Sequence, residues 1–184
     1  MSVNNLNESK VDERKVLIMG LDNSGKTSIL LSLKQNTNLL TYFSLKPTNR
    51  ISIEKMESRS ESYFIWDFGG QEKFRNEYLE QFESFIGGAE KIIFVIDVQD
   101  EDRYEIALDY LADIVKGLKN HDMKVKFSVF LHKYDPQIET RDKLIDKKIR
   151  VKLIKKIKNI MGAEFECQIF RTSIYTVFEK IYLA

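Results

Sequence analysis

The chain has 184 residues, the usual length of a single domain. Hydrophobic residues make up 43% and charged residues 31%, a balance that excludes a fibrous protein and a chain disordered along its whole length. Lys and Arg number 29 against 28 Asp and Glu, so the net charge of +1 gives no reason to expect a nucleic-acid-binding protein. The single cysteine, Cys167, excludes an internal disulfide, and we expect a cytoplasmic protein, with peripheral membrane contact left open.

Hydrophobic patterning predicts alternating strands and helices after a polar tail. Residues 1–13 lack any period, which predicts a disordered tail before one domain at 14–184. Short apolar or alternating runs predict six strands, at 15–19, 51–56, 62–66, 91–97, 126–131 and 166–170. Helical spacing of apolar residues predicts helices at 27–34, 103–118, 143–161 and 174–182. This order predicts an α/β fold with a mostly parallel sheet and right-handed crossovers.

The segment 20–27 reads Gly-Leu-Asp-Asn-Ser-Gly-Lys-Thr and fits the phosphate-loop pattern G-x-x-x-x-G-K-[ST]. A predicted strand precedes it and a predicted helix follows, which is the context that the motif needs. Gly20 and Gly25 let backbone N–H groups point at a polyphosphate, and the helix adds its positive end. Lys26 would neutralise the β- and γ-phosphates, and the Thr27 hydroxyl would bind Mg²⁺. Phosphate binding is the firmest functional prediction.

A second motif, Asp67-Phe68-Gly69-Gly70-Gln71, follows the third predicted strand. Asp67 at a strand end can hold Mg²⁺ through water, and the Gly70 N–H can reach the γ-phosphate. Gln71 can orient an attacking water molecule. A lone D-x-x-G turn is common, but together with a phosphate loop and a following Gln it indicates nucleotide hydrolysis.

With these motifs the sequence resembles a Ras-superfamily small GTPase over roughly residues 14–183. The resemblance implies a P-loop NTPase G domain, with a six-stranded mostly parallel sheet flanked by about five helices. Thr48 matches the family's first-switch Thr, which binds Mg²⁺ and contacts the γ-phosphate. His132-Lys133-Tyr134-Asp135 stands where the family has N-K-x-D. The Asp135 carboxylate can accept both the N1–H and the 2-amino hydrogens of guanine, a pair that adenine does not offer. The Lys133 stem would lie along the base.

His132 in place of Asn is a departure that affects the bracing between this loop and the phosphate loop; the alternative is a loop histidine without a special role. Thr172-Ser173-Ile174 resembles the segment whose backbone N–H meets guanine O6. The implied ligands are GTP or GDP and Mg²⁺. The implied nucleotide-binding residues are Asp22, Asn23, Ser24, Gly25, Lys26, Thr27, Ser28, Gly70, His132, Lys133, Asp135, Ser173 and Ile174. The implied catalytic residues are Gln71, Lys26 and Thr48, and the metal-binding residues are Thr27, Thr48 and Asp67.

Two branches of the family share features with the chain. The phosphate loop and Trp-Asp-Phe-Gly-Gly-Gln-Glu at 66–72 resemble Arf proteins. The segments 95–100, 132–135, 139–141 and 172–175 resemble the Rag/Gtr branch, which we favour. Rag proteins dimerise through a C-terminal roadblock domain, so a roadblock-type or second G-domain partner is one expectation. The first 13 residues do not resemble the myristoylated helix of Arf proteins.

The resemblance implies a molecular switch that hydrolyses GTP to GDP and phosphate. The segment 44–47 has no arginine and Asp22 can crowd the γ-phosphate, so we expect slow hydrolysis until a partner supplies an arginine. Effector, exchange factor and activating protein would bind the switch loops at 39–50 and 69–83. The alternative is a scaffold subunit that holds nucleotide constitutively with negligible hydrolysis. A metabolic P-loop kinase is disfavoured, because the chain has no insertion for a lid and Asp135 favours guanine.

Two further features each leave two interpretations open. The second switch is rich in apolar side chains, which either pack on the core or form a partner surface: Phe68, Phe74, Tyr78, Leu79 and Phe82. The segment 143–158 carries eight basic residues and one acidic residue. Its apolar stripe, Ile145, Ile149, Leu153, Ile157 and Ile160, would dock on the sheet. The basic face is then either simply solvated or a contact for anionic lipid or an acidic partner.

Overall fold

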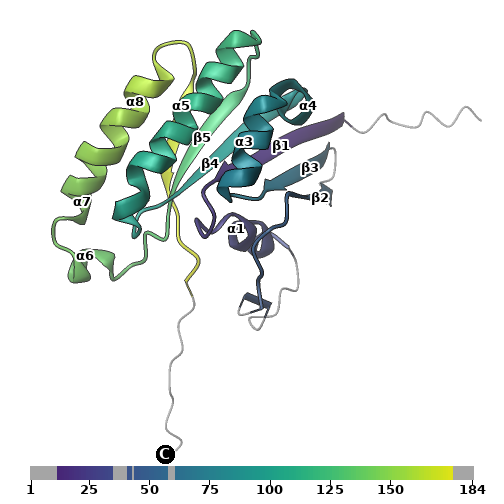
Figure 1. Ribbon diagram of the computed structural model, residues 1–184. Coiled ribbons are helices and arrows are strands. Elements are labelled where there is room, and N and C mark those ends of the chain that lie inside the picture. The colour runs from purple at the N-terminus through teal and green to yellow at the C-terminus, as the bar shows by residue number, and fades with distance from the viewer. Residues whose placement is uncertain (1–11, 35–40, 43, 58–60, 176–184) are drawn as a thin grey trace, which may run out of the picture.

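The computed structural model describes residues 12–34, 41–42, 44–57 and 61–175. Within them a six-stranded sheet has the order β2-β3-β1-β4-β5-β6 (Figure 1). Its strands are β1 (Asp12–Gly20), β2 (Ile51–Glu57), β3 (Glu61–Phe68), β4 (Ala89–Asp97), β5 (Lys126–His132) and β6 (Cys167–Arg171). Only β2 pairs antiparallel, with β3. The predicted α/β fold with a six-stranded, mostly parallel sheet is confirmed.

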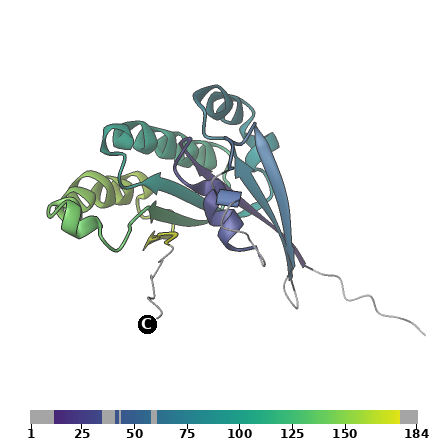
Figure 2. The same cartoon turned by 90° about the horizontal axis from the view of Figure 1, so that it is seen from below.

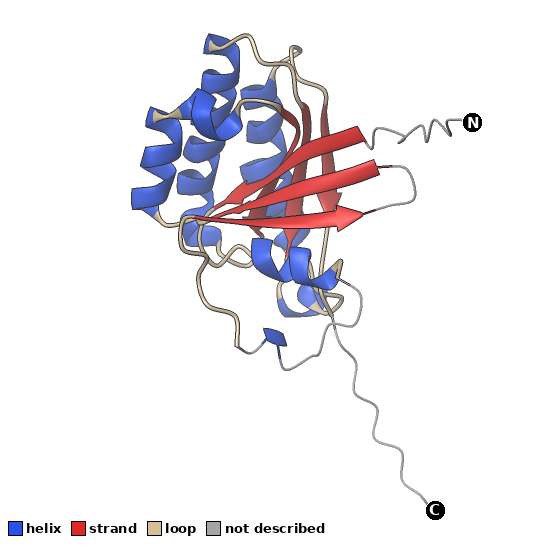
Figure 3. Cartoon of the chain, turned by 90° about the vertical axis from the view of Figure 1, so that its right-hand side faces the viewer, coloured by secondary structure: helices blue, strands red, loops and turns tan. Residues whose placement is uncertain are grey.

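Most of the helices gather on one side of this sheet (Figure 3). The helical segments are α1 (Lys26–Ser32), α3 (Glu72–Glu80), α4 (Phe82–Ile86), the 3-10 turn η1 (Glu101–Arg103), α5 (Tyr104–Asn120), α6 (Ile138–Arg141), α7 (Ile145–Lys148), the π-helical η2 (Ile149–Ile154) and α8 (Lys155–Met161). In the described part of the chain, none of them has the length and apolar character needed to cross a bilayer.

Alternating side chains of the central strands divide the core into two layers. Leu17 and Met19 of β1 point into the larger cluster, which α3, α4, α5 and α8 cover. Val16 and Ile18 point to the other face and meet Ile29 of α1. Figure 2 shows α1 apart from the α5–α8 layer. The helix that follows the phosphate loop therefore has a sheet face of its own.

Several predicted boundaries differ from the observed ones. The strand β1 begins at Asp12, because Glu13 and Arg14 pair in register with Ser62 and Tyr63 of β3, so the last two residues of the predicted tail are strand. The rest of that tail, residues 1–11, lies outside the described residues. Ile174 is not helical, and 176–182 of the predicted last helix also lie outside them.

The second switch is not a plain loop after Gly70, since α3 and α4 occupy most of it. The many polar residues of α3 and α4 obscure the helical spacing of their apolar residues, so the sequence did not predict these helices. Its aromatic side chains pack on the core: Phe68, Tyr78 and Phe82 are buried, and Tyr78 meets Phe68 edge-on at 4.7 Å between ring centroids. The interpretation that these residues belong to the core is confirmed for these three.

The basic segment folds as α7, η2 and α8 in one helical run from 145 to 161 whose middle six residues have π-type geometry. Its predicted apolar stripe is buried apart from Ile160, which is half-buried. On the basic face, Lys148 and Lys152 form ion pairs with Glu101, and Lys156 pairs with Glu105 at 2.5 Å. Part of the positive charge is thus neutralised within the fold, and membrane contact stays an untested prediction.

The helix α5 offers a direct test of this core. Ile114 is fully buried between α5 and the sheet, whereas Ile106 on the same helix is 45% exposed. We expect Ile114→Ala to lower the free energy of unfolding by about 2–5 kcal/mol through lost burial and a residual cavity. The matched variant Ile106→Ala should change it by less than about 1 kcal/mol. Urea unfolding of both variants measures the difference, and equal effects would contradict the described packing.

Candidate functional site

The phosphate loop lies between β1 and α1 and owes its shape to its glycines. Gly20 and Gly25 have φ angles of 140° and 96°, which residues other than glycine rarely adopt. A Cβ on Gly20 would collide with the carbonyl oxygen of Val95 on the neighbouring strand, and one on Gly25 would collide with the ring of His132. The loop is therefore held tightly against β4 and against the end of β5.

Lys26 stands at the start of α1 and is almost completely buried, with 5% of its surface exposed. Its ammonium donates a hydrogen bond to the carbonyl oxygen of Leu21 at 2.6 Å. Burial lowers the pKa of Lys26 to about 8, while the nearby carboxylates of Asp67 and Asp22 counteract this effect. A buried cation in a glycine-rich loop attracts an anion, and a polyphosphate would compensate the charge of the Lys26 ammonium.

Thr27, Thr48 and Asp67 converge beside Lys26 from three different segments. The Thr27 and Thr48 hydroxyl oxygens lie 3.0 Å apart, and they lie 2.5 Å and 3.0 Å from the same carboxylate oxygen of Asp67. Asp67 is fully buried, and within the described part of the chain its other oxygen has no hydrogen-bond partner. Burial raises the pKa of this carboxyl, and the hydrogen bond from Thr27 and the charge of Lys26 counteract the rise.

The donor set fits Mg²⁺. This ion takes oxygen ligands at about 2.1 Å in octahedral geometry, so two neighbouring ligands lie roughly 3.0 Å apart, as the two hydroxyl oxygens do. Among the described residues no group of three or more His, Cys, Asp or Glu could hold a metal ion. One carboxylate and two hydroxyls suit an ion that keeps several waters and shares its remaining positions with phosphate oxygens.

The second switch closes the other side of this site. A cavity of about 220 Å³ is lined by Asp22, Asn23, Gly25, Lys26, Thr27, Ser28, Leu45, Lys46, Pro47, Thr48, Gly70 and Gln71. Gly70 touches the Leu21–Asp22 peptide so closely that a Cβ there would collide with backbone atoms. Gln71 is the residue before α3, and it lines the cavity where a γ-phosphate would lie. Ser24 of the phosphate loop is buried, and among the described residues its hydroxyl has no hydrogen-bond partner.

His132 braces the base-reading loop against the phosphate loop. It ends β5, is 3% exposed, and its ring lies against Gly25. Its Nδ1 lies 2.9 Å from the Thr172 hydroxyl, and burial lowers its pKa. The departure from Asn therefore leaves the two loops in contact, because packing of the ring against Gly25 takes the place of the contact expected of an Asn.

The Asp135 carboxylate is fixed on both sides. The Ser173 hydroxyl donates to one of its oxygens at 2.5 Å, and the Gln99 amide donates to the other at 2.8 Å. The same Gln99 nitrogen donates to the backbone oxygen of Lys133 at 2.8 Å. The Lys133 ammonium pairs with Asp97 at 2.7 Å. Ser173 thus lies beside Asp135, and the Ile174 side chain packs partly buried against the α1-side core.

Two residues of this site escaped the sequence motifs, and both lie on the segment after β4. Gln99 belongs to the stretch 95–100, which served only to distinguish branches of the family. Arg103 ends η1, and its guanidinium contacts Asp22 in the phosphate loop. No motif contains either residue. The run Val-Ile-Asp-Val-Gln-Asp at 95–100, at the end of a central strand, was the one sequence feature that pointed to this segment.

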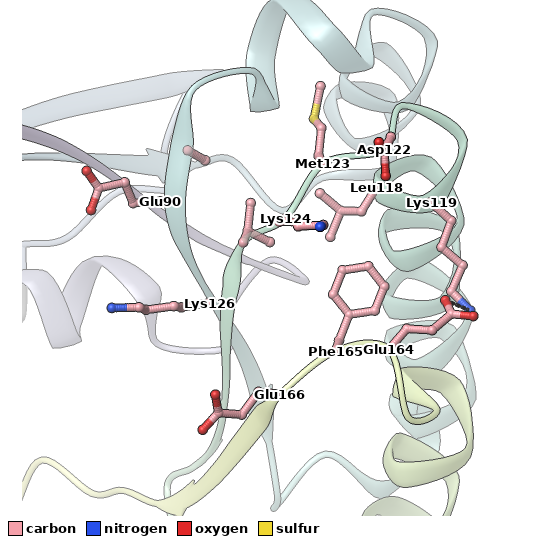
Figure 4. A pocket seen from close by; sticks show the side chains of 12 residues that line it. Glu90, Leu118, Lys119, Asp122, Met123, Lys124, Lys126, Glu164, Phe165 and Glu166 are labelled. Atoms are coloured by element: carbon pink, nitrogen blue, oxygen red, sulfur yellow. Dashed lines mark ion pairs between the residues drawn. The ribbon is translucent and has the colours of Figure 1, made fainter.

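A larger cavity, of about 790 Å³, lies at the opposite edge of the sheet (Figure 4). Leu118 and Phe165 form part of its apolar lining, and Lys119 pairs with Glu164 at its rim. It adjoins the residues where β4, β5 and β6 begin, whereas the phosphate loop follows the end of β1. None of the predicted site residues lines it.

The buried Lys26 generates a prediction about stability. A folded-state pKa of about 8 against an ordinary 10.5 means that the charged form is destabilised by burial in the nucleotide-free protein. We expect Lys26→Met to raise the free energy of unfolding of nucleotide-free protein at pH 7 by roughly 1–3 kcal/mol, while nucleotide binding is lost.

The unfolded state binds more protons at this position above pH 8, so wild-type stability at this site rises with pH and the gap between the two proteins should shrink toward pH 10. Denaturant unfolding at pH 7 and pH 9 measures it, with Lys147→Met on the exposed face of α7 as control. A Lys26→Met protein that is less stable than wild type at pH 7 would contradict the burial cost.

Comparison with known protein families matches residues 15–184 to the Gtr1/RagA G protein conserved region. Among solved structures, the chain is similar to the Arl6 (BBS3) small GTPase from Trypanosoma brucei with the bound nucleotide analogue GppNp. The TM-score is 0.64, with 22% identity over 88% of this chain and 87% of that chain. It is also similar to a structure of the mammalian SRP receptor, with a TM-score of 0.61 and 20% identity over 87% of this chain and 91% of that chain. At such identities the two structures show a shared fold. The family match covers almost the whole sequence, confirms the predicted Rag-like resemblance, and means that the chain belongs to the Gtr1/RagA family of G proteins.

Proposed function

We propose that this G domain is a guanine-nucleotide switch that binds GTP and GDP with Mg²⁺ and hydrolyses GTP slowly. The observation that carries the proposal is the convergence of Thr27, Thr48 and Asp67 beside the buried Lys26. Thr27 belongs to the phosphate loop, Thr48 to the first switch segment, and Asp67 to the end of β3, directly before the second switch segment. A site that draws both switch segments to the phosphates changes its surface when the γ-phosphate leaves.

The arrangement of the site supports the following roles. The backbone N–H groups of the loop and the Lys26 ammonium would hold the β- and γ-phosphates. Mg²⁺ bound by Thr27, Thr48 and Asp67 would neutralise negative charge on the phosphate oxygens. Gln71 would orient the attacking water, and the Gly70 N–H would contact the γ-phosphate. The Asp135 carboxylate, held by Ser173 and Gln99, would accept the two guanine N–H donors.

Slow hydrolysis follows from where the arginines lie. Within the described residues, those that line the nucleotide cavity include two lysines but no arginine. Arg75, the nearest arginine of the second switch, donates to the Gly70 carbonyl oxygen at 3.1 Å and lies over the Tyr110 ring. Arg103 is bound to Asp22 and Asp100. The positive charge that accelerates phosphoryl transfer would therefore come from a partner protein at the switch segments.

The first prediction concerns the bound nucleotide and its turnover. Freshly purified protein, denatured by heat, should release guanine nucleotide, identified by ion-exchange chromatography. Single-turnover hydrolysis should proceed below about 0.01 per second at 25 °C, and Gln71→Leu should slow it at least about tenfold while GDP affinity stays the same. Multiple turnover at several per second by the isolated protein would contradict the proposal.

Two other outcomes of these measurements would change the proposed function. Bound GTP together with unmeasurable single-turnover hydrolysis would replace the switch by the scaffold alternative. Released adenine nucleotide would overturn the role of Asp135.

The second prediction concerns base specificity. Xanthine carries a carbonyl oxygen where guanine has its 2-amino group, so an amide donor in place of the Asp135 carboxylate should favour it. We expect Asp135→Asn to weaken GDP binding by about 100-fold or more and to make XDP the better ligand. Competition titrations with GDP and XDP measure the change, and Asp113→Asn, on the exposed face of α5, serves as the control. Unchanged preference for GDP would mean that another group reads the base.

A further inference from the structure

Arg103 connects the segment after β4 to the phosphate loop. Its Nη1 lies 3.1 Å from a carboxylate oxygen of Asp22, and its Nη2 donates to the Asp22 backbone oxygen at 3.2 Å. Its Nε donates to the Asp100 carboxylate at 2.5 Å. One guanidinium thus holds the loop residue by its side chain and its backbone, while Asp100 fixes the guanidinium from the other side.

The contact between Arg103 and Asp22 bears on nucleotide binding because Asp22 lines the nucleotide cavity. Asp22 lines the nucleotide cavity together with Gly70 and Gln71, and its backbone nitrogen is in contact with Gly70. Its side chain is 49% exposed. A carboxylate at this place repels phosphate oxygens, and it repels GTP more than GDP because GTP carries one more negative charge. The repulsion acts at the end of the loop where the γ-phosphate would lie.

Arg103 removes this repulsion in two ways. Its charge neutralises the carboxylate, and its bond geometry directs the Asp22 side chain toward η1. Both charges also reach the phosphate-binding lysine, since Asp22 raises and Arg103 lowers the pKa of Lys26. With both partners present the two effects oppose each other, and the cavity keeps its positive character.

We propose that Arg103 is a positioning residue that sets the preference of this site for GTP over GDP by neutralising Asp22 and holding it away from the γ-phosphate. The inference rests on the proposed guanine-nucleotide binding. Arg103 touches the loop rather than the nucleotide, so it acts through Asp22. Its loss should therefore affect GTP affinity more than GDP affinity, and only while the Asp22 carboxylate is present.

The test is a double-mutant cycle on the nucleotide preference. Affinities for GDP and for a non-hydrolysable GTP analogue are measured with Mg²⁺ for wild type, Arg103→Ala, Asp22→Asn and the double variant. Arg103→Ala should reduce the GTP-to-GDP affinity ratio by about 5- to 20-fold at low salt, and the reduction should shrink at high salt. In the Asp22→Asn background the same substitution should change the ratio by less than about twofold. Arg150→Ala, on the exposed face of η2, should leave the ratio at the wild-type value.

The outcomes separate the inference from the proposed function. Wild type that binds neither nucleotide would overturn both. Wild type that binds both, with an unchanged ratio in Arg103→Ala, would overturn the role of Arg103 alone. The same applies if GDP and analogue affinities fall equally, or if Asp22→Asn fails to suppress the effect, because Arg103 would then only support the shape of the loop. Thermal unfolding of the GDP-bound variants shows that each is folded.

Discussion

The buried Lys26 ammonium is the constraint around which the site is built. The folded chain gives it one carbonyl oxygen at 2.6 Å and places the Asp67 carboxylate nearby, which leaves the almost completely buried cation incompletely compensated. Burying a charge without full pairing is costly, so the nucleotide-free fold is destabilised at this point. The Ser24 hydroxyl and one Asp67 oxygen are also buried without a hydrogen-bond partner in the part of the chain that the structure describes. The buried, incompletely paired groups lower the stability of this end of the sheet, and a bound phosphate together with a cation would supply the missing partners.

The segment from Asp97 to Arg103 joins the two halves of the nucleotide site. Asp97 holds Lys133, and Gln99 holds Asp135, so this segment fixes the loop that would read the base. Six residues after Asp97, Arg103 holds Asp22 in the phosphate loop. The loops proposed to recognise the base and the phosphates are thus both held by one short connection that leaves the central strand β4. A shift of this segment would alter both ends of the nucleotide pocket together.

The parts of the fold that were predictable from sequence are those specified by local patterns. Short apolar or alternating runs identified the strands, and the fixed positions of 20–27 identified the phosphate loop, because both signals are complete within a few residues. The helices α3 and α4 were missed since their buried Tyr78 and Phe82 stand among charged residues that blur the period. Arg103 and Gln99 were missed for another reason: their partners Asp22 and Asp135 lie 81 and 36 residues away. His132 shows the converse error, since a departure from a motif suggested lost bracing where ring packing against Gly25 supplies it.

Hydrogen bonds join the first and second switch segments, so loss of a γ-phosphate would affect the conformation of both. The Gly69 N–H donates to the Arg50 carbonyl oxygen at 2.6 Å, and the Tyr78 hydroxyl donates to the same oxygen at 2.6 Å. Gly70, which touches the Leu21–Asp22 peptide, therefore cannot move away from the phosphate loop without straining contacts to the residues beside Thr48. Tyr78 is buried among Phe68 and Phe85, so its hydroxyl is a fixed point and not a mobile one. A packed aromatic core allows discrete rearrangements in place of gradual ones. The first and second switches should for this reason change conformation together, with the aromatic cluster of α3 and α4 as the element that either holds or releases both.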